Sequence, residues 1–136
     1  MKVREVIRLL EDGGWYLART KGSHRQFKHR TKRGTVTVSG QSGIDVPPRD
    51  SEQYSQTGWL EIGANMKYAV VVEQGETSFG AHVPDLPGCV AVAETRDEVL
   101  KLIQEAIQFH IEGLREDGLT VPPPSSSVEF VEVRAA

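Results

Sequence analysis

The sequence predicts an α+β fold made of two consecutive modules. A helical pattern at residues 3–10 precedes three strand-like runs, and a second set of strand-like runs from residue 66 precedes a long helical pattern. The net charge also changes sign between the two parts. At 136 residues the chain suffices for one ordinary domain or two very small ones, so neither half could bury a large core alone.

The first module has the pattern helix, strand, strand, strand. Apolar residues recur at helical spacing over residues 3–10, and Gly13-Gly14 ends that helix. Strands are predicted at residues 15–20, 24–29 and 35–39, with turns at Gly22-Ser23 and Arg33-Gly34. A three-stranded sheet with one helix needs a cover on its other face.

The second module begins at Met66 and has the pattern strand, strand, strand, helix, strand. Thr95 and Glu98 form a capping box at the start of a helix that ends at Gly118. The apolar stripe of that helix includes Val99, Ile103 and Ile107. The strands are expected at residues 68–73, 77–83, 89–93 and 128–133.

Charge divides the chain in the same place. Residues 1–48 hold ten Lys and Arg against four Asp and Glu, a net charge of +6, and residues 66–136 hold five against twelve, a net charge of -7. A basic module joined to an acidic one indicates a nucleic-acid surface and a part that could cover it. The alternative is that two small solvated modules merely differ in sign.

Several classes of site are not expected. Cys89 is the single cysteine, which excludes an intramolecular disulfide and a cysteine-based metal cluster. The carboxylates of Asp85, Glu94, Asp97 and Glu98 lack a metal-ligand spacing, and His82 and His110 are interpreted as structural. We therefore expect no cofactor. No long apolar run or signal peptide is recognised, so a cytoplasmic location is expected.

The candidate site is the stretch R-T-K-G-S-H-R-Q-F at residues 19–27. His24 follows a Gly-Ser turn and should lie at a strand edge, where an imidazole can move a proton near neutral pH. Cations could hold a phosphate backbone, and RNA cleavage that uses the ribose 2′-hydroxyl needs no metal. The alternative is a polar strand histidine on a solvated basic face. The candidate RNA-binding residues are Lys21, Ser23, Arg25, Lys28, Arg30, Lys32 and Arg33.

The two modules resemble two different protein families. The opening M-K-V-R-E-V-I-R-L-L-E-D-G-G-W, the core R-T-K-G-S-H-R-Q-F-K-H and the following G-T-V-T-V and D-V-P-P resemble HicA, an mRNA-cleaving toxin. This resemblance implies a double-stranded-RNA-binding-like fold that ends in a second helix, and a catalytic role for His24. From Met66, the motifs M-K-Y-A-V-V-V-E, G-A-H-V-P-D-L-P-G-C and T-R-D-E-V-L-K-L-I-Q-E-A-I resemble the HicB antitoxin. That resemblance implies a partial ribonuclease-H-like fold, without nuclease activity of its own.

Residues 49–65 depart from the HicA pattern where its second helix is expected. The stretch has no helical apolar stripe, and synonymous codons exist for which one deleted base gives G-T-L-S-N-I-L-K-Q-A-G-L-R followed by a stop. We interpret it as out-of-frame or intergenic read-through between two adjacent genes. An ordinary polar linker is the alternative.

The sequence thus predicts a toxin–antitoxin polypeptide: a HicA-like module at residues 1–48 and a HicB-like module at residues 66–136 that neutralises it. Cleavage of RNA is expected to be weak or absent because the second helix is missing. The antitoxin module is expected to self-associate and to bind either its own N-terminal module or a separate HicA-type toxin. Many HicB antitoxins carry a C-terminal DNA-binding segment, and operator DNA binding is not expected here because the sequence stops at Ala136. Two alternatives stay open: a noncatalytic RNA-binding module, and a protein-binding HicB-like domain with an inert N-terminal remnant.

Overall fold

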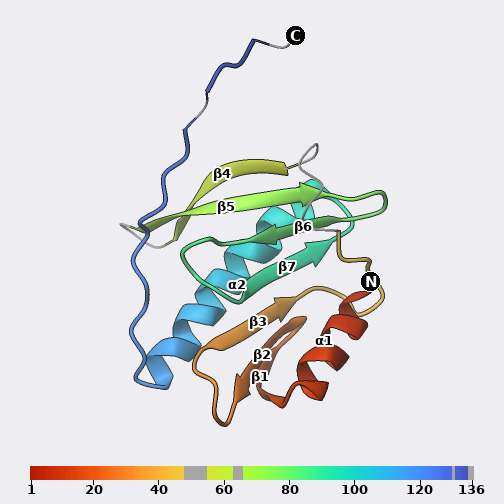
Figure 1. The fold of residues 1–136 in the computed structure, drawn as a ribbon, viewed down its shortest axis with the longest axis vertical. Coiled ribbons are helices and arrows are strands. Elements are labelled where there is room, and N and C mark those ends of the chain that lie inside the picture. The colour runs from red at the N-terminus through yellow and green to blue at the C-terminus, as the bar shows by residue number, and fades with distance from the viewer. Residues whose placement is uncertain (48–54, 63–65, 130, 135–136) are drawn as a thin grey trace.

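In the computed structural model, residues 1–47, 55–62, 66–129 and 131–134 are described. They form two helices on one mixed sheet of seven strands (Figure 1). The elements in chain order are α1 (Val3–Asp12), β1 (Trp15–Lys21), β2 (His24–His29), β3 (Thr35–Ser39), β4 (Ser55–Ile62), β5 (Met66–Gln74), β6 (Phe79–His82), β7 (Cys89–Ala93) and α2 (Arg96–Glu116). The α+β class and the order of elements up to α2 follow the sequence pattern, with β4 as an addition.

The two predicted modules share this sheet. Its strand order is β1-β2-β3-β7-β6-β5-β4, and neighbouring strands are antiparallel except for β3 and β7. There the parallel register aligns Thr37 with Cys89, Val38 with Val90 and Ser39 with Ala91. The β3–β7 seam therefore joins residues 1–47 to residues 66–93 through backbone hydrogen bonds.

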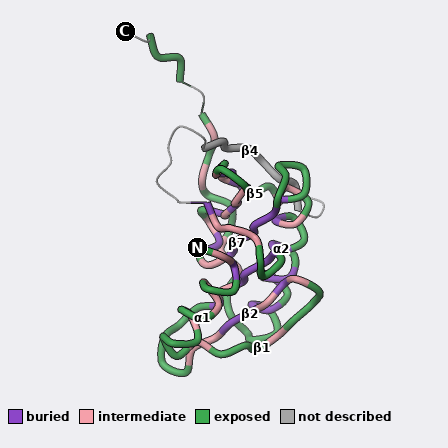
Figure 2. Tube along the Cα trace, turned by 90° about the vertical axis from the view of Figure 1, so that its right-hand side faces the viewer, coloured by how far each residue is buried: buried purple, intermediate pink, exposed green. Residues whose placement is uncertain are grey.

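Each face of the sheet has its own apolar core. On the α1 side, Val3, Phe27, Val38 and Val92 are buried together, with Ile7 and Trp15 packed against them. On the α2 side, a larger core includes Tyr68, Val70, Ala91, Ile103 and Ile107. Figure 2 shows buried residues along the central strands and α2, and exposed ones along α1 and β1.

The ends of α2 follow from its sequence. Thr95 is the N-cap, since its hydroxyl oxygen accepts the Glu98 backbone N–H at 3.2 Å, as the capping box predicts. Gly118 has φ +70, a backbone conformation that suits glycine beyond a helix end. Within the part of the chain that the structure describes, no helix is both long and apolar enough to cross a bilayer.

One sequence expectation needs correction, and the region expected to be a linker holds a strand. Residues 128, 129 and 131–134 are not in a strand, and Val131 and Val133 are about four-fifths exposed. The strand at the end of the sheet beyond β5 is instead β4, which comes from residues 55–62. The region expected to be a linker contains β4, which pairs antiparallel with β5 from Ser55 to Ile62; Thr57, Trp59 and Ile62 are residues with high strand propensity. The other residues of that region, 49–54 and 63–65, lie outside the described part of the chain.

Candidate active site

His24 begins β2 and is buried, with 7% of its surface exposed. It pairs in register with Ser39 of β3, and the two side chains share one face of the sheet. Its Nδ1 lies 2.6 Å from the Ser39 Oγ, and its Nε2 lies 3.3 Å from the Glu105 Oε2 on α2. Both ring nitrogens of the candidate catalytic histidine therefore have partners.

The chemistry of these partners determines where the imidazole proton lies. An ionised Glu105 carboxylate can only accept, so a neutral His24 donates Nε2–H to it and accepts the Ser39 hydroxyl proton at Nδ1. A protonated His24 donates from both nitrogens. In either state the Glu105 carboxylate is the hydrogen-bond partner of the His24 Nε2. A ligand that approached the ring from the α2 side would have to displace it.

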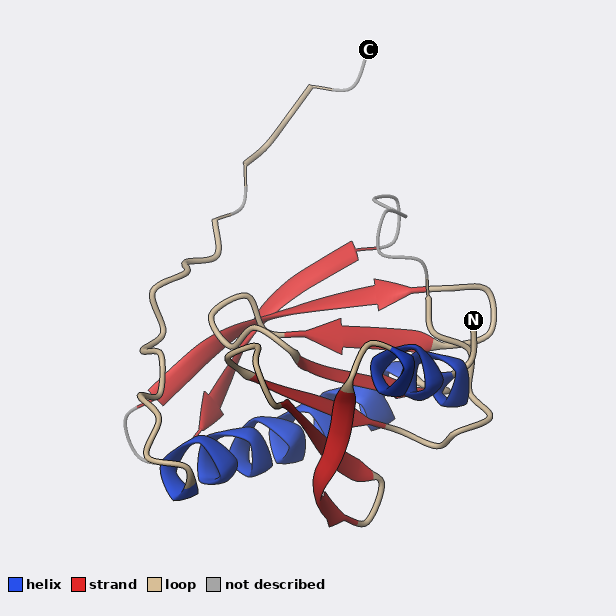
Figure 3. Ribbon diagram, turned by 60° about the horizontal axis from the view of Figure 1, so that its bottom comes forward, coloured by secondary structure: helices blue, strands red, loops and turns tan. Residues whose placement is uncertain are grey.

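The face around His24 is polar. Alternation along β2 and β3 directs one set of side chains toward α2 and the other set, which includes Phe27 and Val38, toward α1. The set toward α2 consists of His24, Gln26, Lys28, Thr35, Thr37 and Ser39. This is the face that the sequence left without a cover, and α2 covers it (Figure 3).

Hydrogen bonds connect this polar face to α2. The Gln26 Nε2 donates to the Phe109 backbone oxygen at 2.7 Å, and the Thr37 Oγ1 lies 2.7 Å from the His110 Nδ1. Burial lowers the pKa of His110 from 6.5 to about 4, so its imidazole is neutral at pH 7. Each of these polar groups needs its partner because none reaches bulk water.

Charges at the end of α2 meet cations of the sheet. The Lys28 Nζ lies 2.8 Å from the Asp117 Oδ2, and the Arg19 Nε lies 3.6 Å from the Glu116 Oε2. The Arg19 guanidinium also stacks over the Phe109 ring, 4.8 Å from its centre. Ion pairs between the two halves therefore lie on the same face of the sheet as His24.

A pocket of about 490 Å³ lies beside His24. Its walls come from the turn between β1 and β2 and from one face of α2, and they include Lys21, Ser23, Glu105, Gln108 and Glu112. Two carboxylates and one lysine give this opening an acidic character. It therefore disfavours an approaching phosphate group.

The predicted RNA-binding residues are distributed over several places. Lys21 and Ser23 line the pocket, and Lys28 is paired with Asp117. Arg25 is on the other face, where its Nη1 donates to the backbone oxygen of Gly40 at 3.0 Å. Arg30, Lys32 and Arg33 are exposed in the loop at the far end of β2. The structure does not gather them into one site around His24.

His29 organises that loop, and the sequence reasoning missed it. Its Nδ1 accepts the backbone N–H groups of Thr31 and Lys32, each at 3.1 Å, and its Nε2 lies 3.0 Å from the Gly13 oxygen. The ring fills the space beside Gly14, where a Cβ would come within 2.7 Å of Nε2. Sequence reasoning also missed Gln26, Glu105 and Phe109, because their roles depend on contacts between the halves, and Ser39, which meets His24 through the pairing of β2 with β3. Among the described residues no group of three metal-binding side chains is present.

Comparison with known families identifies both halves. Residues 68–135, half of the chain, match the model of the HicB-like antitoxin of the bacterial toxin–antitoxin system. The chain belongs to the HicB-like antitoxin family. Residues 3–49 match the model of the HicA toxin of bacterial toxin–antitoxin systems. One polypeptide therefore carries a HicA domain followed by a HicB-like domain, a toxin–antitoxin fusion.

Curated relatives agree with this assignment. The chain is 37% identical over 76 residues to a protein named antitoxin HicB 2 of Photorhabdus laumondii, covering 55% of each chain. It is 33% identical over 66 residues to an uncharacterized 14.9 kDa protein of Haemophilus phage HP1, covering 48% of this chain and 50% of that one. A UPF0150 protein of Archaeoglobus fulgidus is 36% identical over 72 residues, 51% of this chain and 97% of the relative. The chain thus spans about half the length of the first two relatives. No solved structure matches it.

Proposed function

We propose that this chain is a toxin–antitoxin polypeptide held in its neutralised state, in which helix α2 of the HicB-like domain covers the RNA-cleaving residue of the HicA-like domain. The observation that carries the proposal is the contact of the His24 Nε2 with the Glu105 Oε2 at 3.3 Å, with His24 buried. His24 would act as general base or general acid on the ribose 2′-hydroxyl or the leaving oxygen. Cations such as Lys21 would stabilise the charged phosphorus intermediate.

Three features of the site would keep RNA away from His24. Glu105 occupies one ring nitrogen of His24, so a substrate hydroxyl cannot hydrogen-bond there. The pocket beside His24 is lined by Glu105 and Glu112, whose charges repel a phosphate. Lys28, a candidate phosphate ligand, is held by Asp117. RNA cleavage by the native chain is therefore expected to be weak or absent.

The test compares RNA cleavage by full-length variants. Glu105→Ala together with Phe109→Ala removes the carboxylate and the ring beside His24, and we expect cleavage of a ribose-containing substrate to appear or to rise at least tenfold. Addition of His24→Ala should remove that activity. Glu129→Ala with Phe79→Leu supplies a control with the same number of changes away from His24.

The measurement needs a check of folding and a check of contamination. Circular dichroism must give the same spectrum for each variant, and an oligonucleotide with 2′-deoxyribose at each position must stay intact. The ribonuclease proposal would be contradicted by a folded Glu105→Ala, Phe109→Ala protein that does not cleave RNA, or by one whose cleavage persists after His24→Ala.

A noncatalytic RNA-binding function is the second candidate. Lys21, Arg30, Lys32 and Arg33 are exposed, and none of these four side chains forms an ion pair with another of the described residues. RNA bound by the native chain in a salt-dependent manner, and lost on Arg30→Ala with Lys32→Ala, would favour this candidate. Cleavage by the unmasked variant would favour the first.

A further inference from the structure

We propose that the HicB-like domain completes the fold of the HicA-like domain, so that the helix that masks His24 is also a structural part of the toxin. The inference rests on the proposed function for its meaning in RNA cleavage. Its structural basis is a set of contacts across the β3–β7 seam and between α2 and the sheet. Its consequence is that removing the HicB-like domain does not release a folded toxin.

Strand β7 serves both cores. Cys89, Ala91 and Ala93 belong to the core on the α2 side, whereas Val92 is buried in the core on the α1 side. Val90 is packed against that second core as well. The apolar core of the HicA-like part, which holds Val3 and Phe27, is thus closed by valines of the HicB-like part. Without β7, the side of β3 that now pairs with β7 would be an open edge.

The seam is fitted at the level of the backbone. The Thr37 backbone N–H donates to the Gly88 oxygen at 2.7 Å. Gly88 has φ +86, and a Cβ there would come within 2.6 Å of the Thr35 oxygen. Gly40, with φ +133, leaves no space for a Cβ beside the Val92 oxygen. A glycine from each domain allows this close approach.

Helix α2 supplies partners that the polar face of the HicA-like sheet requires. Gln26 and Thr37 are at most 1% exposed, and their side chains bond the Phe109 oxygen and His110, respectively. Removal of α2 would expose this face to water. The same helix packs Ile103 and Ile107 into the HicB-like core. Helix α2 is therefore held by both domains at once, and separating the domains breaks its contacts with the HicA-like sheet.

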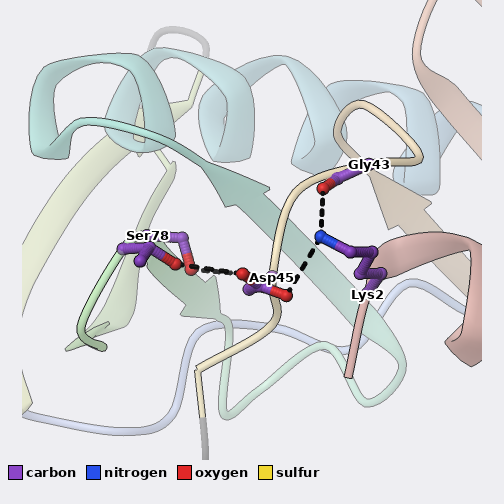
Figure 4. Close-up of polar contacts among 5 residues, drawn as sticks. Lys2, Gly43, Asp45 and Ser78 are labelled. Carbon is purple, nitrogen blue, oxygen red and sulfur yellow. Dashed lines mark hydrogen bonds and ion pairs between the residues drawn. The ribbon is translucent and has the colours of Figure 1, made fainter.

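A third connection lies at the end of the HicA-like part (Figure 4). The Ser78 hydroxyl donates to the Asp45 backbone oxygen, and the Thr77 hydroxyl donates to the Asp45 Oδ2 at 3.1 Å. Lys2 lies 3.4 Å from the Asp45 Oδ1 and donates to the Gly43 oxygen. The turn before β6 is therefore tied to residues that also hold the start of α1.

These contacts together determine what cleavage between the domains would do. A strand, a helix and a turn of the HicB-like domain each make contacts that the HicA-like part lacks by itself. Cutting the chain should leave the two pieces associated. Loss of the HicB-like piece should unfold the HicA-like piece rather than activate it.

The experiment begins with the full chain carrying a protease recognition sequence between Pro48 and Ser55. The cut protein should remain one particle on size-exclusion chromatography. After separation of the pieces in guanidinium, the N-terminal piece holds Trp15 as its single tryptophan, so its fluorescence reports folding. We expect no cooperative unfolding transition for that piece alone, and recovery of one when the C-terminal piece is added.

Matched variants of the C-terminal piece test the stated contact. Val92→Ser should weaken association of the two pieces at least tenfold, because Val92 is 3% exposed in the shared core. Val131→Ser, at a position 80% exposed, should leave association unchanged.

Each result decides the inference. A cooperative transition of the N-terminal piece alone would overturn it, and so would an unfolded piece that the C-terminal piece fails to restore. Equal effects of Val92→Ser and Val131→Ser would also overturn it. None of these readouts uses RNA, so they are separate from a failure of the ribonuclease proposal.

Discussion

Gly113 of α2 lies directly against Gln26 of β2. A Cβ on Gly113 would come within 2.6 Å of the Gln26 Nε2, so the absence of a side chain on the helix admits the glutamine. Gln26 cannot easily move away, because it is 1% exposed and donates to the Phe109 oxygen at 2.7 Å. A glycine in the HicB-like domain is thus fitted to a glutamine in the HicA-like domain.

Gly113→Ala should therefore destabilise the chain. In a helix without neighbours this change would stabilise by about 0.5–1 kcal/mol, whereas overpacking a buried contact costs about 1–3 kcal/mol. We expect the free energy of unfolding to fall by roughly 1–2 kcal/mol in urea denaturation. Combination with Gln26→Ala should remove most of the effect, as in a double-mutant cycle. A stabilised Gly113→Ala protein would mean that α2 does not press against β2.

The pH dependence of stability should reflect His110. Because burial lowers its pKa from 6.5 to about 4, the folded state holds His110 neutral while the unfolded state binds a proton below pH 6.5. Stability should therefore be complete above pH 6.5 and decline as the pH falls from 6.5 toward 4. The total loss should be on the order of 3 kcal/mol.

Urea denaturation at half-unit steps between pH 7.5 and 4.5 measures this decline. His110→Asn keeps a side-chain nitrogen near Thr37 but does not titrate, so the slope between pH 6.5 and 4.5 should become flatter. An unchanged slope in that variant would assign the decline to other groups.

The local structure around the candidate site could be predicted from the sequence. The Gly22-Ser23 turn, the start of β2 at His24 and the Thr95 cap follow from short-range preferences, and each is present. Both family resemblances also rested on short motifs and are confirmed by the family matches. These features depend on residues a few positions apart.

The partners of His24 could not be predicted in this way. Glu105 lies 81 positions from His24 and, in the sequence, is one of several acidic residues on the polar side of a helix. Its contact depends on the parallel pairing of β3 with β7, for which the sequence has no local signal. The same long-range pairing makes α2 the cover of a face that sequence reasoning had left bare. The sequence signal for this cover was the alternation of polar residues along β3, such as Thr37, which the structure shows to be buried.

Asp85 holds the segment that follows α2. Its carboxylate accepts the backbone N–H and hydroxyl groups of Ser125 and Ser126 at 2.7–3.1 Å, and these bonds lower its pKa, with the Ser126 backbone N–H as the largest cause. Asp85→Ala should therefore speed amide hydrogen exchange at Ser125 and Ser126, with little change in α2. Asp97→Ala, at an exposed position in the first turn of α2, is the control. Equal exchange rates in the Asp85→Ala and native proteins would show that these bonds do not hold the segment.

Cys89 offers a direct test of whether the β3–β7 seam opens on its own. It pairs in register with Thr37, is 1% exposed, and burial raises the pKa of its thiol to about 12. Because the thiolate is the reactive form, an aromatic disulfide reagent should label it only after the seam or the whole chain opens. If the domains share one fold, labelling requires global unfolding, and the logarithm of its rate should rise with urea at the slope of the equilibrium transition. Cys89→Ala provides the background. Labelling that is fast and independent of urea would instead mean that the seam opens locally, with the HicA-like and HicB-like domains separating in the native chain.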